Sequence, residues 1–91
     1  MSTAFEPTFS AREAAAILGR SYSWIDQRLR QDQFTYSDES VIRPPRTAAG
    51  YRRFDVETIK DVAFCCYRNN WFTTMRELRD SLHRLCVAAY T

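Results

Sequence analysis

The segment Ser10–Ile25, SAREAAAILGRSYSWI, predicts a short helix with well-defined ends. Ser10 and Glu13 form a capping box, in which the serine hydroxyl accepts from a backbone N–H and the carboxylate reaches back to the N–H of the cap. Gly19 tolerates the left-handed conformation that closes many helices. Between these ends, three side chains at helical spacing predict one buried face: Ala14, Ile17 and Leu18.

A second helix is predicted to follow almost at once. Ser21 is suited to cap it, and Ile25 and Leu29 form its buried stripe. Because the turn between the two helices is very short, residues of about 10–31 are typical of a helix-turn-helix. Trp24 is expected to pack in the core between the helices rather than to act as a wedge between bases.

A second informative stretch, Gly50–Phe54 (GYRRF), predicts a basic strand that leaves a hairpin tip. Its partner strand is predicted at Val41–Arg43, with Pro44–Gly50 as the tip and Tyr51–Phe54 as the returning strand. This two-stranded β-hairpin, residues of about 41–54, has the form of a wing.

Two further helices are predicted after the wing. Asp55 is suited to cap the first, residues of about 56–69, which Asn69 and Asn70 end. Thr74 and Glu77 predict a second capping box before a helix of about 75–88. The apolar stripe of that last helix contains Met75, Leu78, Leu82, Leu85 and Ala89. The expected fold class is mainly α, a winged helix-turn-helix of four helices and a β-hairpin, in a single domain spanning residues 1–91.

Composition and charge narrow the possible functions. The chain has 91 residues, 45% of them hydrophobic, and a net charge of +2. Residues 20–53 hold seven basic and four acidic residues, whereas residues 54–91 hold five of each. The positive charge therefore lies where a DNA-binding element is predicted. The sequence has no apolar run long enough for a membrane span and no signal-peptide pattern at residues 1–6, so we expect a cytoplasmic protein.

Catalysis and metal binding are not expected. The sequence shows no nucleophile–base pattern and no phosphate-cradling glycine loop, so we predict that the protein is not an enzyme and needs no cofactor. Cys65, Cys66 and Cys86 are odd in number, which favours reduced thiols. His83 and Cys86 supply at most half of a zinc site, so no metal site is predicted.

From Phe9 to about Leu85 the chain resembles the DNA-binding domain of the MerR family. The matching features are the capped first helix with Leu18-Gly19, the second helix from Ser21, the wing end Gly50–Phe54, Asp55 and the segment Trp71–Leu78. The resemblance implies a winged helix-turn-helix that binds double-stranded DNA. It also implies that Tyr51 and Arg52 touch the DNA backbone.

The departures from this family indicate a particular subgroup. The long dimerisation helix and the effector site of full MerR regulators are absent, so no small-molecule effector is expected. The chain resembles instead the small MerR-like excisionases of temperate phages, also called recombination directionality factors. These bend DNA and turn a tyrosine integrase towards excision, so a phage integrase and the nucleoid of a bacterial host are the expected partner and location. The polar stretch Gln31–Ser40 is expected to be irregular, with an extended piece at Phe34–Tyr36. Relative to the family, residues 35–40 look like an insertion between the second helix and the wing. Asn70 replaces a glycine of the family.

Ten residues are predicted to bind DNA. Ser23, Gln27 and Arg28 are the predicted base readers, because glutamine pairs with adenine and arginine with guanine. The remaining predicted contacts on or near the second helix are Arg20, Ser21 and Arg30, and those on the wing are Arg46, Tyr51, Arg52 and Arg53.

The sequence leaves two alternatives to an excisionase: a small transcriptional regulator that binds an operator, and a protein-interaction module without a DNA role. Surplus apolar residues on the last two helices predict head-to-tail self-association on DNA. They are Phe64, Tyr67, Trp71, Phe72 and the tail Val87–Tyr90, although Phe64 and Trp71 are expected to fill the core. A monomer or weak dimer is expected in free solution.

Overall fold

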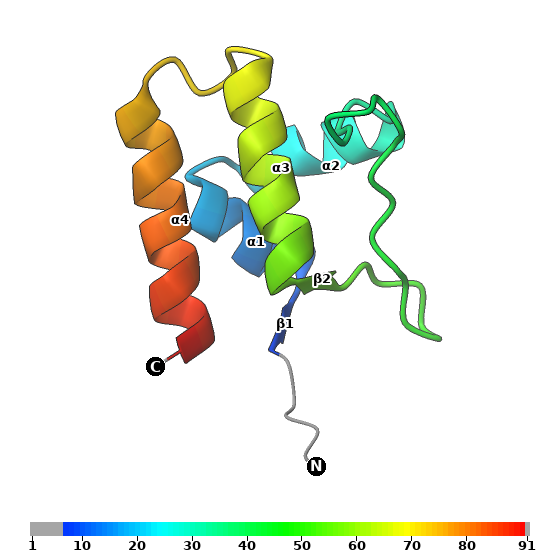
Figure 1. The fold of residues 1–91 in the computed structure, drawn as a ribbon. Helices are drawn as coiled ribbons and strands as arrows, with labels where there is room; N and C mark the ends of the chain where they lie inside the picture. The colour runs from blue at the N-terminus through cyan, green and yellow to red at the C-terminus, as the bar shows by residue number, and fades with distance from the viewer. Residues whose placement is uncertain (1–6, 91) are drawn as a thin grey trace.

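The computed structural model describes residues 7–90 and contains four helices and one small sheet. Residues 1–6 and Thr91 lie outside the described residues. The expectation that residues 1–6 carry no signal-peptide pattern therefore concerns a segment that the structure does not describe. In chain order the elements are β1 (Thr8–Phe9), α1 (Ala11–Leu18), α2 (Tyr22–Arg30), β2 (Phe54–Asp55), α3 (Val56–Arg68) and α4 (Met75–Tyr90) (Figure 1). The prediction of a mainly helical chain with four helices is confirmed for this part of the molecule.

The ends of α1 and α2 are those that the local sequence signals predict. Ser10 Oγ accepts from the N–H of Glu13 at 3.1 Å, and Glu13 Oε1 accepts from the N–H of Ser10 at 2.7 Å. Gly19 closes α1 with φ at +70°, a conformation that few residues with a Cβ adopt. Ser21 Oγ then caps α2 by accepting from the N–H of Trp24 at 3.1 Å.

A long-range contact also secures the end of α1. Arg84 of α4 donates from Nε to the carbonyl oxygen of Ile17 at 2.7 Å and from Nη2 to Ser81 Oγ at 3.1 Å. A cation at the C-terminal carbonyls of a helix is favourable for the helix dipole. The turn between α1 and α2 is therefore held against α4.

The predicted hairpin sheet is wrong. The sheet instead pairs β1 antiparallel with β2, with Thr8 opposite Asp55 and Phe9 opposite Phe54. Between residues 41 and 53 only isolated bridges form, from Thr35 to Val41 and from Arg46 to Arg52. Pro44 and Pro45 directly follow the first predicted strand and limit pairing there, because proline has no N–H for a ladder and a fixed φ.

Two loops replace the predicted hairpin. We call residues 45–53 the hairpin loop. Backbone hydrogen bonds join its two sides, from Arg53 N to Pro45 O at 2.8 Å and from Thr47 N to Tyr51 O at 2.7 Å. It projects from the body of the molecule at the lower right of Figure 1. The other loop, residues 35–41, lies between two buried anchors, Phe34 and Ile42, whose backbones are joined at 2.9 Å.

The second pair of helices follows the predicted bounds closely. Asp55 Oδ1 caps α3 by accepting from the N–H of Thr58 at 2.8 Å, and Asn70 takes a left-handed φ of +61° after its end. Thr74 caps α4, but the predicted capping box is only half formed. The carboxylate of Glu77 turns away from the cap and accepts from Thr73 and Arg20.

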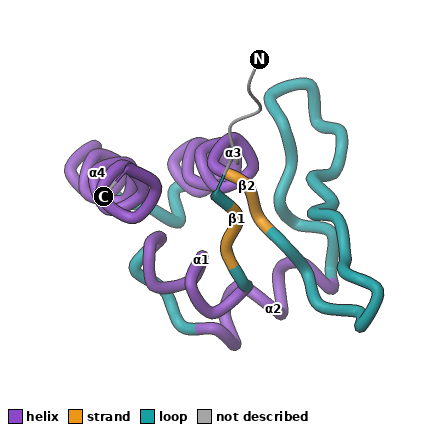
Figure 2. The backbone as a smooth tube through the Cα atoms, turned by 90° about the horizontal axis from the view of Figure 1, so that it is seen from below, coloured by secondary structure: helices purple, strands orange, loops and turns teal. Residues whose placement is uncertain are grey.

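The core lies where all four helices meet. Figure 2 shows α3 and α4 end on, with the short sheet between α3 and the pair of α1 and α2. The large side chains with the least solvent access include Phe34, Phe54 and Phe72. Trp24 and Trp71 are partly buried against this core, as predicted, whereas Phe64 is 40% exposed and the expectation that it fills the core is wrong.

In residues 7–90 no helix is both long enough and apolar enough to cross a membrane.

Candidate nucleic-acid interface

A groove of about 460 Å³ opens where the N-termini of α1 and α2 meet the hairpin loop. Its lining contains five arginines but a single carboxylate, that of Asp26. We call it the arginine groove; its arginines are Arg12, Arg30, Arg46, Arg52 and Arg53. An excess of guanidinium groups beside two helix N-termini creates a positive field that suits a polyanion.

Asp26 ties the hairpin loop to α2. Its carboxylate accepts from Arg30 Nε at 2.7 Å and from Arg52 Nη1 at 3.3 Å. The side chain of Arg30 remains 73% exposed, whereas that of Arg52 is only 16% exposed. Arg52 therefore acts mainly as a link within the protein, and Arg30 presents its free donors to solvent.

The other arginines of the hairpin loop have backbone partners. Arg46 donates from Nη1 to the carbonyl oxygen of Gly50 at 2.9 Å, and Arg53 donates to the carbonyl and hydroxyl oxygens of Thr8 at 3.0 and 2.9 Å. Gly50 has φ at +91°, so this turn favours glycine. Tyr51 is 73% exposed beside it. The loop thus holds Arg46 and Tyr51 at the open side of the groove.

Arg12 and Tyr22 also line the groove, although neither is among the ten predicted contacts. The guanidinium of Arg12 lies 4.6 Å from the centre of the Tyr22 ring, which joins the first turns of α1 and α2. A sequence signal for Arg12 existed: it lies two residues after the cap of α1, where its side chain is close to the N-terminus of the helix.

The face of α2 that points away from the core is polar and exposed. Ser23 and Gln27 lie on it, opposite the buried Ile25 and Leu29. Ser21 is exposed too, but its hydroxyl is used by the cap of α2. Of the predicted base readers, Ser23 and Gln27 are therefore exposed on α2, the helix that also contributes Asp26 and Arg30 to the arginine groove.

Arg20 lies elsewhere and is bound by the protein itself. It donates from Nη2 to the carbonyl oxygen of Trp71 at 2.6 Å and to Glu77 Oε2 at 3.0 Å, and it stacks near the rings of Trp24 and Phe72. Hydrogen bonds from Arg20 and Thr73 lower the pKa of the Glu77 carboxyl below its usual value. Arg20 therefore joins the turn after α1 to α4, a structural role that the prediction of a DNA contact missed.

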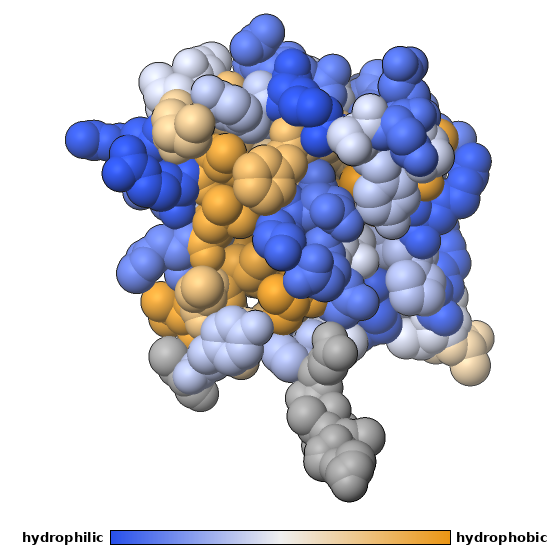
Figure 3. Space-filling view, in the orientation of Figure 1, coloured by the Kyte–Doolittle hydropathy of each residue, from blue (hydrophilic) through white to orange (hydrophobic). Residues whose placement is uncertain are grey.

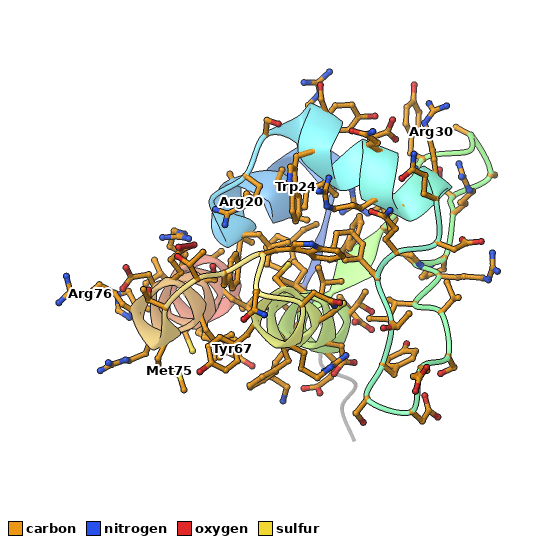
Figure 4. The ribbon with its side chains drawn as sticks, turned by 90° about the horizontal axis from the view of Figure 1, so that it is seen from above. Arg20, Trp24, Arg30, Tyr67, Met75 and Arg76 are labelled. Atoms are coloured by element: carbon orange, nitrogen blue, oxygen red, sulfur yellow. The ribbon has the colours of Figure 1, made fainter. Side chains whose placement is uncertain are left out.

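Arg28 is also outside the arginine groove. Its guanidinium carbon lies 3.9 Å from the ring centre of Trp24 and 5.1 Å from that of Trp71. Figure 4 shows Arg20 and Trp24 on the side of α2 towards the turn between α3 and α4, with Arg30 at the other end of the helix. The two flanks of α2 therefore carry different arginines.

The three cysteines lie in different environments. Cys65 and Cys66 are buried, whereas Cys86 is exposed. Burial raises the pKa of the Cys66 thiol to about 12, so this group stays protonated at neutral pH. Within residues 7–90 no three side chains of the His, Cys, Asp and Glu types come together in a way that would hold a metal ion.

A family model described as "Domain of unknown function (DUF7229)" matches residues 1–88 of the chain. No curated protein and no solved structure matches the chain.

Proposed function

The chain belongs to the DUF7229 family, a domain of unknown function, and we propose that it binds double-stranded DNA as a MerR-like winged helix. In this proposal α2 enters the major groove, and the hairpin loop serves as the wing against the neighbouring backbone. The observation that carries the proposal is the arginine groove, which adjoins the exposed polar face of α2. The sequence resemblance to the MerR domain supports the same assignment.

The charge of the groove favours phosphates over other acidic partners. Asp26 compensates only part of the positive charge of five arginines, and the N-termini of α1 and α2 add the positive ends of two helix dipoles. A DNA backbone presents regularly spaced monoanions to such a surface, and its counterions are released when arginines replace them.

Binding to a fluorescent duplex tests the proposal directly. The affinity is expected to fall steeply as salt rises, with a slope of log affinity against log salt of about −0.9 per phosphate neutralised. A protein that does not bind duplex DNA at low salt, or binds it with no salt dependence, would overturn the proposal.

Gln27 is expected to contribute base selectivity. Replacing Gln27 by Ala should weaken binding to a duplex selected from a random library by about 1–3 kcal/mol, with a much smaller loss on a scrambled duplex, because the lost contact is to a base edge. The comparison of both duplexes in one binding assay measures this. Gln33→Ala is the matched control, since Gln33 is exposed beyond the end of α2. Equal losses of Gln27→Ala on both duplexes would rule out base readout.

We further propose that DNA binding serves site-specific recombination, with the chain acting as an excisionase that bends DNA for a tyrosine integrase. The resemblance to the small MerR-like excisionases supports this. So does an apolar band between α4 and α3, visible on the front face in Figure 3, which is suited to contact a second copy on neighbouring DNA. Exposed apolar side chains of α3 and α4 include Phe64, Met75 and Val87.

Cooperative loading is the expected consequence. The affinity per site should be at least about tenfold higher on three phased direct repeats than on one isolated site, because each bound copy adds a protein contact for the next. Mobility-shift titrations on both duplexes measure the difference. Equal affinity per site, or a two-fold dimer on a palindrome, would contradict the excisionase assignment and favour a transcriptional regulator.

A further inference from the structure

The flank of α2 opposite the arginine groove contains one arginine whose position is set by aromatic rings. Arg28 is half-buried, with its guanidinium stacked on Trp24 at 3.9 Å and close to Trp71 at 5.1 Å. These two rings also contact one another edge to face, with centres 5.6 Å apart. Arg28 is therefore restricted in its rotamers before any ligand binds.

The side chain of Arg28 differs from those of nearby arginines because it has no polar partner among residues 7–90. Arg20, Arg30 and Arg52 each form an ion pair with a carboxylate. The side chain of Arg28 forms neither a hydrogen bond nor an ion pair with any described residue, and its Nε is shielded from solvent without a partner. Unlike Nε, the two terminal nitrogens of the guanidinium, Nη1 and Nη2, are not buried without a partner. They provide charged donors at a fixed place, without a nearby carboxylate bonded to them.

We infer that Arg28 is a pre-organised phosphate-binding residue, which holds the DNA strand on the side of α2 away from the hairpin loop. The inference rests on the proposed function. A helix in the major groove, about 12 Å wide, has a backbone on each side of it. Asp26 and Arg28 lie on the two flanks of α2, beside the buried Ile25 and Leu29, while Gln27 points outward between them. The arginine groove faces one strand, and Arg28 faces the other.

This role differs from the guanine contact that the sequence predicts for Arg28. A guanidinium stacked against Trp24 and Trp71 is held at the flank of α2, so its free donors meet phosphate oxygens rather than base edges. Stacking also lowers the entropy lost when a hydrogen bond forms, because the side chain is already ordered. Trp24 and Trp71 act as positioning residues for Arg28.

The test compares Arg28→Met with Arg76→Met. Methionine keeps apolar contact with both rings. Arg76, the control residue, is an exposed arginine of α4 whose side chain has no polar partner in the described residues. Figure 4 places Arg76 far from α2. Anisotropy with a labelled mixed-sequence duplex should show about tenfold weaker binding for Arg28→Met and a salt slope smaller by about one. The losses should be equal on selected and scrambled duplexes. Arg76→Met should bind like the unmodified protein.

Intrinsic fluorescence supplies a second readout, because the chain has only two tryptophans and both contact Arg28. Duplex DNA is expected to change the tryptophan emission of the unmodified protein and to change that of Arg28→Met much less. Arg28→Lys, which keeps the charge without the planar stack, should give an intermediate affinity and allows the test even where Arg28→Met folds poorly.

The outcomes separate the two proposals. Normal affinity and salt slope for Arg28→Met, in a protein that binds DNA, would overturn the role of Arg28 and leave the proposed function intact. A loss confined to the selected duplex would also overturn it, in favour of base readout. Failure of the unmodified protein to bind any duplex would overturn both.

Discussion

Replacing Arg30 by Glu is expected to lower the affinity for duplex DNA by about 30-fold at moderate salt. Arg30 lies at the edge of the arginine groove with its side chain 73% exposed, and its Nε bond to Asp26 directs the remaining donors outward. Glutamate at this position removes one phosphate contact, adds repulsion, and places a second carboxylate one turn from Asp26. Together these effects are expected to cost about 2 kcal/mol of binding free energy.

Arg43→Glu is the matched control for this charge reversal. Arg43 is 71% exposed and pairs with Asp32 at 3.4 Å, but it lies outside the arginine groove. Both variants change the net charge equally, so a general electrostatic effect would weaken both alike. Anisotropy titrations that show the same loss for the two variants would contradict a specific role for the groove.

Replacing Phe34 by Ala is expected to lower the free energy of unfolding by about 3–5 kcal/mol. Phe34 is 1% exposed, and its ring centre lies 6.1 Å from that of Trp24 and 6.0 Å from that of Trp71. The substitution leaves a cavity between α2 and the turn after α3, and it frees the anchor of the loop formed by residues 35–41. In a domain of this size, such a loss is a large part of the total stability.

Urea unfolding followed by circular dichroism measures the change. Tyr36→Ala is the control, because Tyr36 belongs to the same loop but is 39% exposed, and its loss should be below about 1 kcal/mol. Similar losses for the two variants would show that Phe34 does not anchor the loop as its burial indicates.

The helices could be predicted from sequence because their ends depend on neighbouring residues. The caps at Ser10, Ser21 and Asp55 and the left-handed Gly19 and Asn70 act within one helical turn. The sheet could not be predicted in this way. Its two strands, Thr8–Phe9 and Phe54–Asp55, are far apart in the chain and are brought together by burial of Phe9 and Phe54.

The candidate site shows the same division. The polar face of α2 with Ser23 and Gln27 follows from helical periodicity, and the basic residues of the hairpin loop follow from their local pattern. The partners of the arginines do not follow from either. Asp26 pairs with Arg52, and Glu77 pairs with Arg20, through contacts between distant segments. Only the folded structure therefore separates Arg30, which is exposed, from Arg20 and Arg52, which are bound within the protein.

In the proposed function, α2 and the hairpin loop together form a DNA-binding surface. Titration of the ¹⁵N-labelled protein with a mixed-sequence duplex of about 20 base pairs at about 50 mM salt, where phosphate contacts bind strongly, tests it most directly. The amide signals of Arg12, Ser23, Gln27, Gly50 and Tyr51 are predicted to shift together, while those on the apolar band near Phe64 and Met75 stay in place. Shifts confined to that band, or no shifts at all, would contradict the claim.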